Sequence, residues 1–120
     1  MKKDDWIKEF DAAVTVTDAE GRIIEMNDKS AEVFAADGGR ALIGRSVFDC
    51  HPEPSRSKLR SMIETGRKNI YTIQKNGKKK LIYQAPWQKD GQCAGFVEIS
   101  FEIPWEMPHF NRDGAGPVAE

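Results

Sequence analysis

Two dipeptides constrain the fold of this chain more than any other feature of its sequence. Asn76-Gly77 and Asp90-Gly91 are residue pairs preferred in two-residue β-hairpin turns, because both turn positions need a positive φ. The segments beside them are rich in β-branched and aromatic residues, which favour strands. We therefore expect three consecutive antiparallel strands, at about residues 69–74, 80–87 and 93–103.

A further hairpin is predicted near the N-terminus. From Val14 onward the segment VTVT alternates apolar and polar residues, which is the two-residue period of a half-buried strand. Residues 18–21 carry turn chemistry, and RIIEM then continues as a second strand. We therefore expect a hairpin over residues 12–27.

The middle of the chain predicts helices. Asn27 or Asp28 can cap a helix that carries Phe34 on its apolar side, and a second helix is expected at about residues 55–65. The apolar positions of this second helix are Leu59, Met62 and Ile63, spaced i, i+3 and i+4. Because these stripes must be buried, the helices should cover one face of the sheet, which gives an α+β fold.

Length and charge narrow the function classes. The 120 residues are enough for one domain, and 18 basic against 19 acidic residues give a net charge of −1. This balance gives no reason to expect a nucleic-acid or membrane partner. Two cysteines are too few for a disulfide framework, and we see neither a signal peptide nor an apolar run long enough to span a membrane. We predict a cytoplasmic protein with free thiols.

The order of these elements resembles that of the PAS (Per-Arnt-Sim) sensor family. The family motif is a strand, an Asp-x-x-Gly turn, and a second strand that ends in Asn at the start of a helix. The matching positions are Asp18, Gly21, Asn27 and Ala31. Gly95 opens the final strand after an Asp-Gly turn, and LIGRSVFD represents the family's Gly-containing connector. The resemblance covers about residues 12–103.

The resemblance implies a five-stranded antiparallel sheet in the order 2-1-5-4-3, with helices over one face and an interior cavity. Such domains bind a small molecule, a haem, a flavin or only a partner protein, and they are rarely enzymes. We divide the chain into an N-terminal amphipathic helix at 1–11, a PAS domain at 12–103 and an irregular tail at 104–120. We expect a stand-alone, bacterial-type sensor that is not an enzyme and signals to a partner protein in trans.

Cys50 and His51 stand side by side and are the most conspicuous candidates for chemistry. A catalytic pair would have to face each other and needs a third, orienting group, and neither condition is indicated. Zinc needs three or four ligands, and the spacing of the cysteines and histidines supplies no such set. The chain differs from flavin-binding PAS domains of the LOV subtype, because Val47 stands where their adduct-forming cysteine should be.

Haem is the alternative that the residues leave open, although they do not favour it. In haem-binding PAS domains the axial histidine comes from near the helix before the third strand, and His51 lies just ahead of that helix. We expect His51 instead to shape the start of the helix beside the pocket, or to contact a small ligand. A third alternative is a protein-interaction module that holds no ligand.

We expect the pocket to lie between the sheet and the helix at 55–65, with a mainly apolar lining. The residues expected to line it are His51, Cys50, Tyr83, Gln84 and Ile99. In the last strand Ile99 belongs to the apolar face, which we expect toward the helix, whereas Glu98 and Ser100 should then face solvent or a dimer interface.

The N-terminal segment predicts a homodimer. Trp6, Ile7 and Phe10 are large and apolar and fall within about one helical turn. A helix this short is not stable alone in water, so it must pack against something. We expect two copies to meet through this helix and the face of the sheet that the other helices leave open.

Overall fold

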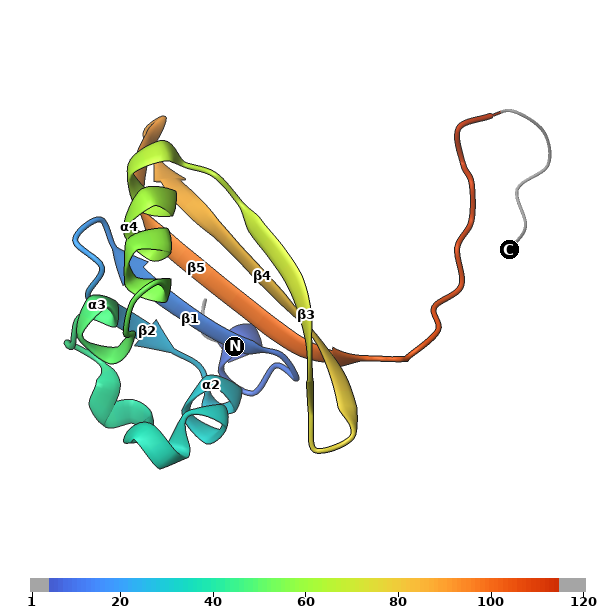
Figure 1. Cartoon of the computed structure of the whole chain (residues 1–120), viewed down its shortest axis with the longest axis horizontal. Helices are drawn as coiled ribbons and strands as arrows, with labels where there is room; N and C mark the ends of the chain where they lie inside the picture. The colour runs from blue at the N-terminus through green and yellow to red at the C-terminus, as the bar shows by residue number, and fades with distance from the viewer. Residues whose placement is uncertain (1–4, 115–120) are drawn as a thin grey trace.

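The computed structural model describes residues 5–114, apart from the side chain of Cys50. Five antiparallel strands form one sheet in the order β2-β1-β5-β4-β3, and helices lie against it (Figure 1). The strands are β1 (Ala13–Asp18), β2 (Ile23–Met26), β3 (Asn69–Lys75), β4 (Lys78–Lys89) and β5 (Gln92–Ile103). The fold class and the strand order expected from the sequence are confirmed.

The helices are short except for one. They are α1 (Asp5–Lys8), α2 (Asp28–Val33), η1 (Ala35–Asp37), η2 (Gly39–Leu42), α3 (Val47–Cys50) and α4 (Ser55–Thr65). Helix α4 has the predicted bounds and ends at Gly66, whose φ of 70° is the left-handed conformation typical of a helix terminus. Helix α1 ends at Lys8, before the end at residue 11 that the sequence predicts, and residues 1–4 of the predicted helix lie outside the described residues.

The turns follow the chemistry of their residues. Asn76 and Asp90 have φ angles of 55° and 53°, and the glycine after each also has a positive φ. Both positions of a type I′ hairpin turn need this conformation, and Asn, Asp and Gly adopt it at the lowest cost. The β3–β4 and β4–β5 hairpins are therefore determined locally.

The apolar core lies at the α4 end of the sheet. Its buried residues are Ile23, Met26, Leu42, Val47, Leu59, Met62 and Phe96. Phe96 is the only β5 side chain among them, and it packs in the same cluster as Leu59 and Met62 of α4. Because successive side chains of a strand point to opposite faces, Phe96 identifies which face of β5 meets the helices.

This assignment reverses the expected orientation of β5. Glu98 and Ser100 share the face of Phe96, so they point toward the helices, and Ser100 is only 5% exposed. Ile99 and its apolar neighbours point to the other face. The expectation that the apolar face of β5 lies against the helix at 55–65 is therefore wrong. The period of the pattern is correct, but a two-residue period does not say which face the helices cover.

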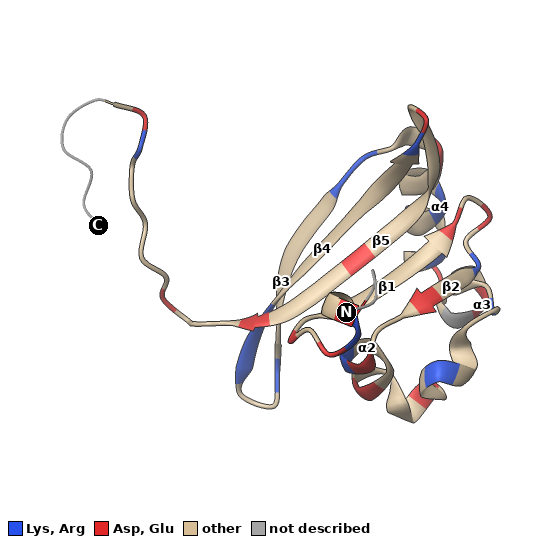
Figure 2. Cartoon of the chain, turned by 180° about the vertical axis from the view of Figure 1, so that it is seen from behind, with Lys and Arg blue, Asp and Glu red and all other residues tan. Residues whose placement is uncertain are grey.

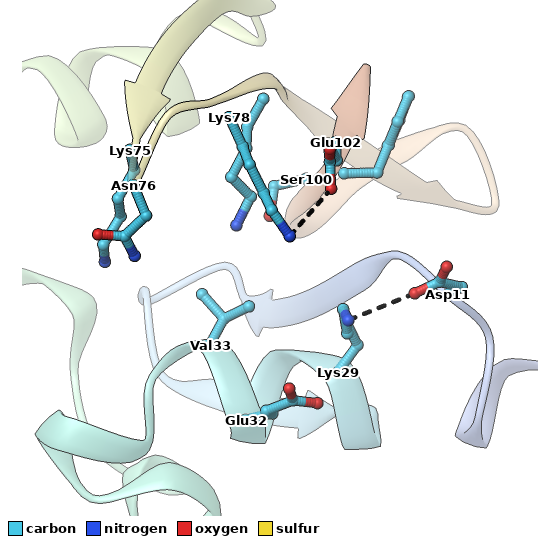
Figure 3. Close-up of a pocket in the computed structure, with 11 residues that line it drawn as sticks. Asp11, Lys29, Glu32, Val33, Lys75, Asn76, Lys78, Ser100 and Glu102 are labelled. Atoms are coloured by element: carbon cyan, nitrogen blue, oxygen red, sulfur yellow. Dashed lines mark ion pairs between the residues drawn. The ribbon is translucent and has the colours of Figure 1, made fainter. Parts of the chain in front are cut away.

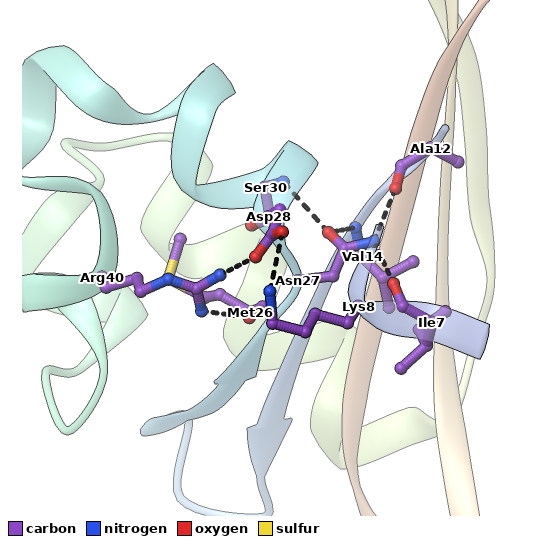
Figure 4. Close-up of polar contacts among 9 residues, drawn as sticks. All are labelled: Ile7, Lys8, Ala12, Val14, Met26, Asn27, Asp28, Ser30 and Arg40. Carbon is purple, nitrogen blue, oxygen red and sulfur yellow. Dashed lines mark hydrogen bonds and ion pairs between the residues drawn. The ribbon is translucent and has the colours of Figure 1, made fainter. Parts of the chain in front are cut away.

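Asn27 joins α1, β1 and α2 through its side chain (Figure 4). Its Oδ1 accepts hydrogen bonds from the backbone N–H groups of Val14 and Ser30, both at 3.0 Å, and the second of these caps α2. Its Nδ2 donates to the carbonyl oxygens of Ala12, at 2.8 Å, and Ile7, at 3.1 Å. The predicted helix cap is confirmed, and it fixes α2 against β1.

Beyond β5 the chain leaves the sheet. Figure 2 shows this tail running away from the strands, seen from the side opposite α4. Between Pro104 and Gly114 it contains neither helix nor strand, and Trp105 and Met107 are 55% and 59% exposed. Within the part of the chain that is described, no helix is long and apolar enough to cross a membrane.

Candidate functional site on the helical face of the sheet

The helical face of the sheet is polar beyond the core. Gln84 pairs with Glu98 across β4 and β5, and Ile82 pairs with Ser100 one step further along. Gln84 is only 7% exposed and Ser100 5% exposed. A packed core would place apolar side chains here, because a buried polar group costs free energy unless it is hydrogen-bonded.

A chain of hydrogen bonds crosses three strands on this face. Asn69 Nδ2 donates to Gln84 Oε1 at 3.0 Å, and Gln84 Nε2 donates to Glu98 Oε1 at 2.7 Å. Tyr71 lies two residues beyond Asn69 on the same face of β3. We call Asn69, Tyr71, Gln84 and Glu98 the Gln84 cluster. It presents amide, phenol and carboxylate groups together, a set that can recognise a hydrogen-bonding ligand.

Burial raises the pKa of Tyr71 above its ordinary value of 10.0, and the nearby charge of Glu98 raises it further, whereas a hydrogen bond with Gln84 lowers it. An ionised Tyr71 is therefore less favourable in the folded protein than in the unfolded chain. The unfolded chain releases this proton first as the pH rises through 10.0, so the contribution of Tyr71 to stability is lost above that pH.

We expect Tyr71 to titrate above pH 10.0 in a Tyr83→Phe variant, where it is the only tyrosine left. Glu98→Gln should lower this pKa without restoring the ordinary value, because burial, the larger cause, remains. The ultraviolet absorbance of tyrosinate measures both effects. Glu102→Gln is the control, since it removes a carboxylate further along the same face of β5. A Tyr71 pKa at or below 10.0 would contradict this description of the cluster.

A pocket of about 440 Å³ opens on the same face of the sheet, between α2, the β3–β4 hairpin and β5 (Figure 3). No member of the Gln84 cluster lines it, but Ser100 does, two residues from Glu98 on the same face of β5. Its volume is typical of small-molecule sites. The lining residues are Asp11, Lys29, Glu32, Val33, Lys75, Asn76, Lys78, Lys80, Ser100, Phe101 and Glu102. This lining is mostly charged and lies beside α2, whereas the sequence suggested an apolar pocket beside α4.

The structure separates the residues that the sequence suggested for the pocket. Gln84 lies on the helical face, but Tyr83 and Ile99 pair with each other on the opposite face. Ile99 and Tyr83 are therefore not part of the site proposed below. The side chain of Cys50 lies outside the described part of the structure.

His51 ends helix α3. Its Nδ1 is 2.7 Å from the carbonyl oxygen of Val47, so Nδ1 carries the proton and donates it. The carbonyl oxygen of His51 in turn accepts a hydrogen bond from Arg56 of α4. These bonds hold His51 at the α3–α4 junction, and it is not among the residues that line the pocket in Figure 3. Its role as an axial ligand of haem stays a prediction.

Sequence reasoning missed three members of the Gln84 cluster, namely Asn69, Tyr71 and Glu98. Each is an ordinary strand residue, and they meet only because β3, β4 and β5 pair in one particular register. The two hairpin turns contain part of this information, since turn type and loop length set the register of a hairpin. Counting outward from Asn76-Gly77 would have placed Asn69 opposite Gln84.

The three apolar residues expected at a dimer interface lie near the start of β1. Trp6 is 60% and Phe10 50% exposed, and their rings meet edge to face at 5.8 Å between centroids. Ile7 is half-buried, and its carbonyl oxygen accepts the bond from Asn27. At least half of the surface of Trp6 and of Phe10 is therefore left uncovered by the described part of the chain.

The sequence matches the PAS fold family over residues 8–103, which is most of the chain. The chain therefore belongs to the PAS family, whose members are generally sensory. A comparison with curated proteins gives no match.

Solved structures show the same fold at low sequence identity. A C-terminal domain from Streptococcus mutans superposes with a TM-score of 0.67 at 21% identity, covering 81% of this chain and 79% of that one. The PAS domain of Bordetella pertussis BvgS gives 0.58 at 17%, covering 82% and 81%. The Vibrio cholerae VqmA dimer gives 0.61 at 17%, covering 95% of this chain and 57% of VqmA. A further structure shows VqmA bound to DPO.

Proposed function

We propose that this chain is a sensory PAS module that binds a small molecule on the helical face of its sheet and signals through protein contacts, without catalysis of its own. The observation that supports this proposal most is the Gln84 cluster, in which a nearly buried amide donates a hydrogen bond to a carboxylate near a pocket. The cytoplasmic location expected from the sequence stays a prediction.

Energetics support a recognition role for the cluster. A buried amide that exchanges water for protein partners gains only about 1 kcal/mol per hydrogen bond, so an apolar residue of the same size would serve stability as well. Polar groups retained next to a pocket are instead what gives a ligand site its orientation and specificity. VqmA, which shares this fold, has been captured with a bound ligand, DPO.

The proposal is tested by the melting temperature of the protein against a library of small polar molecules. A true ligand should raise the melting temperature of the wild type, because it binds only the folded state. Gln84→Leu should abolish this rise. Gln74→Leu is the control, since Gln74 is an exposed residue of β3. A rise that survives Gln84→Leu would place the ligand elsewhere, and the absence of any stabilising molecule would favour the interaction module.

Haem binding is the second candidate function, and the geometry of His51 is the observation that favours it. A ring nitrogen that donates to a backbone carbonyl, as Nδ1 does to Val47, leaves Nε2 free and fixes its direction, which is the arrangement of many metal-bound histidines. A visible spectrum of the protein mixed with haem decides between the candidates. A Soret band that His51→Ala abolishes would favour haem over the ligand proposed here.

We also propose a homodimer, as the sequence suggests. The outer face of the sheet is apolar and half-buried at Val14, Val97 and Ile99, and Trp6 adds exposed apolar surface. Full burial of an exposed apolar side chain contributes roughly 1.5–3 kcal/mol. Trp6 could gain much of this in a dimer, whereas the half-buried strand residues would gain only part of it. A dimer would give the module a surface through which ligand binding alters contacts with a partner.

We expect a dimer at tens of micromolar, and we expect Trp6→Ala combined with Phe10→Ala to weaken dimerisation by roughly a hundredfold or more. Sedimentation equilibrium measures the dissociation constant. Ile43→Ala is the control, because Ile43 is also an exposed apolar residue but lies in a different part of the fold, after η2. A monomeric wild type, or a dimer that the double variant leaves intact, would count against this interface.

A further inference from the structure

The pocket on the helical face carries an unequal set of charges. Four lysines and three carboxylates line it, an excess of one positive charge. Two of the lysines are neutralised within the pocket, because Lys29 lies 3.4 Å from Asp11 and Lys78 lies 3.6 Å from Glu102, as the dashed lines in Figure 3 mark. The remaining lysines, Lys75 and Lys80, form no ion pair within the described part of the chain.

Lys80 is the more informative of these two lysines. It lies on the helical face of β4 opposite Glu102, and its side chain is half-buried. The carboxylate of Glu102 is already paired with Lys78. A cation that is partly removed from water without a close partner costs free energy, and an anion in the pocket would remove that cost.

Ser100 supplies a second, independent observation. It lines the pocket and is only 5% exposed. Within the described structure, no hydrogen bond involves its hydroxyl group. Every fully enclosed side-chain nitrogen or oxygen of the described residues does have a partner. The Ser100 hydroxyl must therefore retain contact with the open space of the pocket, where it can donate to a ligand.

We infer that this pocket binds a small monocarboxylate, held by the ammonium group of Lys80 and the hydroxyl of Ser100. Lys75 and the amide of Asn76 lie on the hairpin wall and add donors, as Figure 3 shows. Val33 on the opposite wall provides an apolar contact. This inference names the ligand class of the proposed sensor and rests on the proposal that the helical face holds a small molecule.

The acidic residues of the pocket indicate whether its ligand carries one negative charge or more than one. Glu32 stands on α2 without an ion pair in the described region, across the pocket from the hairpin lysines. A dianion such as phosphate would meet repulsion from this carboxylate, whereas one carboxylate matches the single excess positive charge. Figure 2 shows basic residues, in blue, on both strands of the β3–β4 hairpin near its turn.

Benzoate is the probe, and benzamide is its neutral counterpart of nearly the same shape. We expect benzoate to bind saturably and to shift the amide resonances of Lys80 and Ser100 in an NMR titration, whereas benzamide and inorganic phosphate bind more weakly by about tenfold or more. Lys80→Met should weaken benzoate binding by about tenfold, and Ser100→Ala by roughly threefold to tenfold. Ser100→Ala is a small change that preserves the strand.

Lys79→Met is the matched control, because the adjacent lysine points to the other face, with its Nζ 5.7 Å from the ring centroid of Trp105. It removes the same charge and should leave benzoate binding unchanged. The inference is overturned if benzoate does not bind, or if benzamide or phosphate binds as tightly as benzoate. It is also overturned if Lys79→Met weakens benzoate binding as much as Lys80→Met does. A neutral ligand that depends on Gln84 alone would overturn the carboxylate inference and leave the proposed function intact.

Discussion

Replacing Gly95 by alanine is expected to lower the free energy of unfolding by about 3 kcal/mol or more, a large part of the roughly 5–15 kcal/mol that stabilises a typical domain. Gly95 has a φ of 153°, a conformation that residues with a side chain rarely adopt. A methyl group there would overlap the carbonyl oxygen of Thr17 and would lie 2.7 Å from Trp87 Nε1.

The overlap cannot be relieved locally. The carbonyl of Thr17 belongs to β1, which pairs with β5 along its whole length, and it also accepts a hydrogen bond from Trp87 Nε1 at 2.9 Å. Moving β1 would break this bond and disturb the ladder between β1 and β5. A family resemblance based on Gly95 therefore has a physical basis, because β1, β4 and β5 meet too closely for any larger residue.

Gly91→Ala is the matched control for this prediction. Gly91 also has a positive φ, of 79°, but a methyl group there would meet no atom within 4 Å. Its cost should be limited to backbone strain, about 1 kcal/mol. Urea denaturation of the two variants measures the difference. Equal losses of stability would show that the close approach at Gly95 is not what makes a glycine necessary there.

Asn27→Ala is expected to reduce the free energy of unfolding by about 3 kcal/mol and the melting temperature by roughly 12 °C. Asn27 is 5% exposed, and its side chain makes four hydrogen bonds to backbone groups. The substitution would remove the cap of α2 and leave the N–H of Val14 and the carbonyl of Ala12 without this partner.

Two comparisons separate the contributions of Asn27. Asn27→Asp retains the acceptor for Val14 and Ser30, but it replaces the donor to Ala12 and Ile7 by a carboxylate oxygen that faces their carbonyl oxygens. It should therefore cost at least as much as Asn27→Ala, although the cap of α2 is kept. Ser46→Ala removes only the single cap bond from the N–H of Phe48, at 3.1 Å, and should cost about 1 kcal/mol. If Asn27→Ala costs no more than Ser46→Ala, the bonds to β1 and α1 add nothing to stability.

The parts of the fold that could be predicted from the sequence are those that neighbouring residues determine. Asn76-Gly77 and Asp90-Gly91 predict their hairpins because both residues of each turn adopt a positive φ. Helix α4 follows from the apolar spacing of Leu59, Met62 and Ile63. The strand order required the family resemblance, since no local pattern determines which strands are neighbours.

The candidate site was harder to predict, for two physical reasons. The alternation in β5 gives two faces but not their surroundings, and here the more apolar face, with Val97 and Ile99, lies away from α4. The Gln84 cluster depends on the register of three strands, so only Gln84 was identified in advance. An apolar strand face is therefore a poor guide to the pocket when the outer face of a sheet is itself available for a partner.

The native mass spectrum of the protein as purified tests ligand binding on the helical face most directly. We expect the wild type to carry a small molecule in addition to its own 13.5 kDa, and we expect Gln84→Leu, purified identically, to have lost it while Gln74→Leu retains it. The same molecule, added back, should raise the melting temperature of the wild type but not that of Gln84→Leu. A wild type that carries no molecule and is stabilised by none, or an adduct that Gln84→Leu retains in full, would contradict the proposed site.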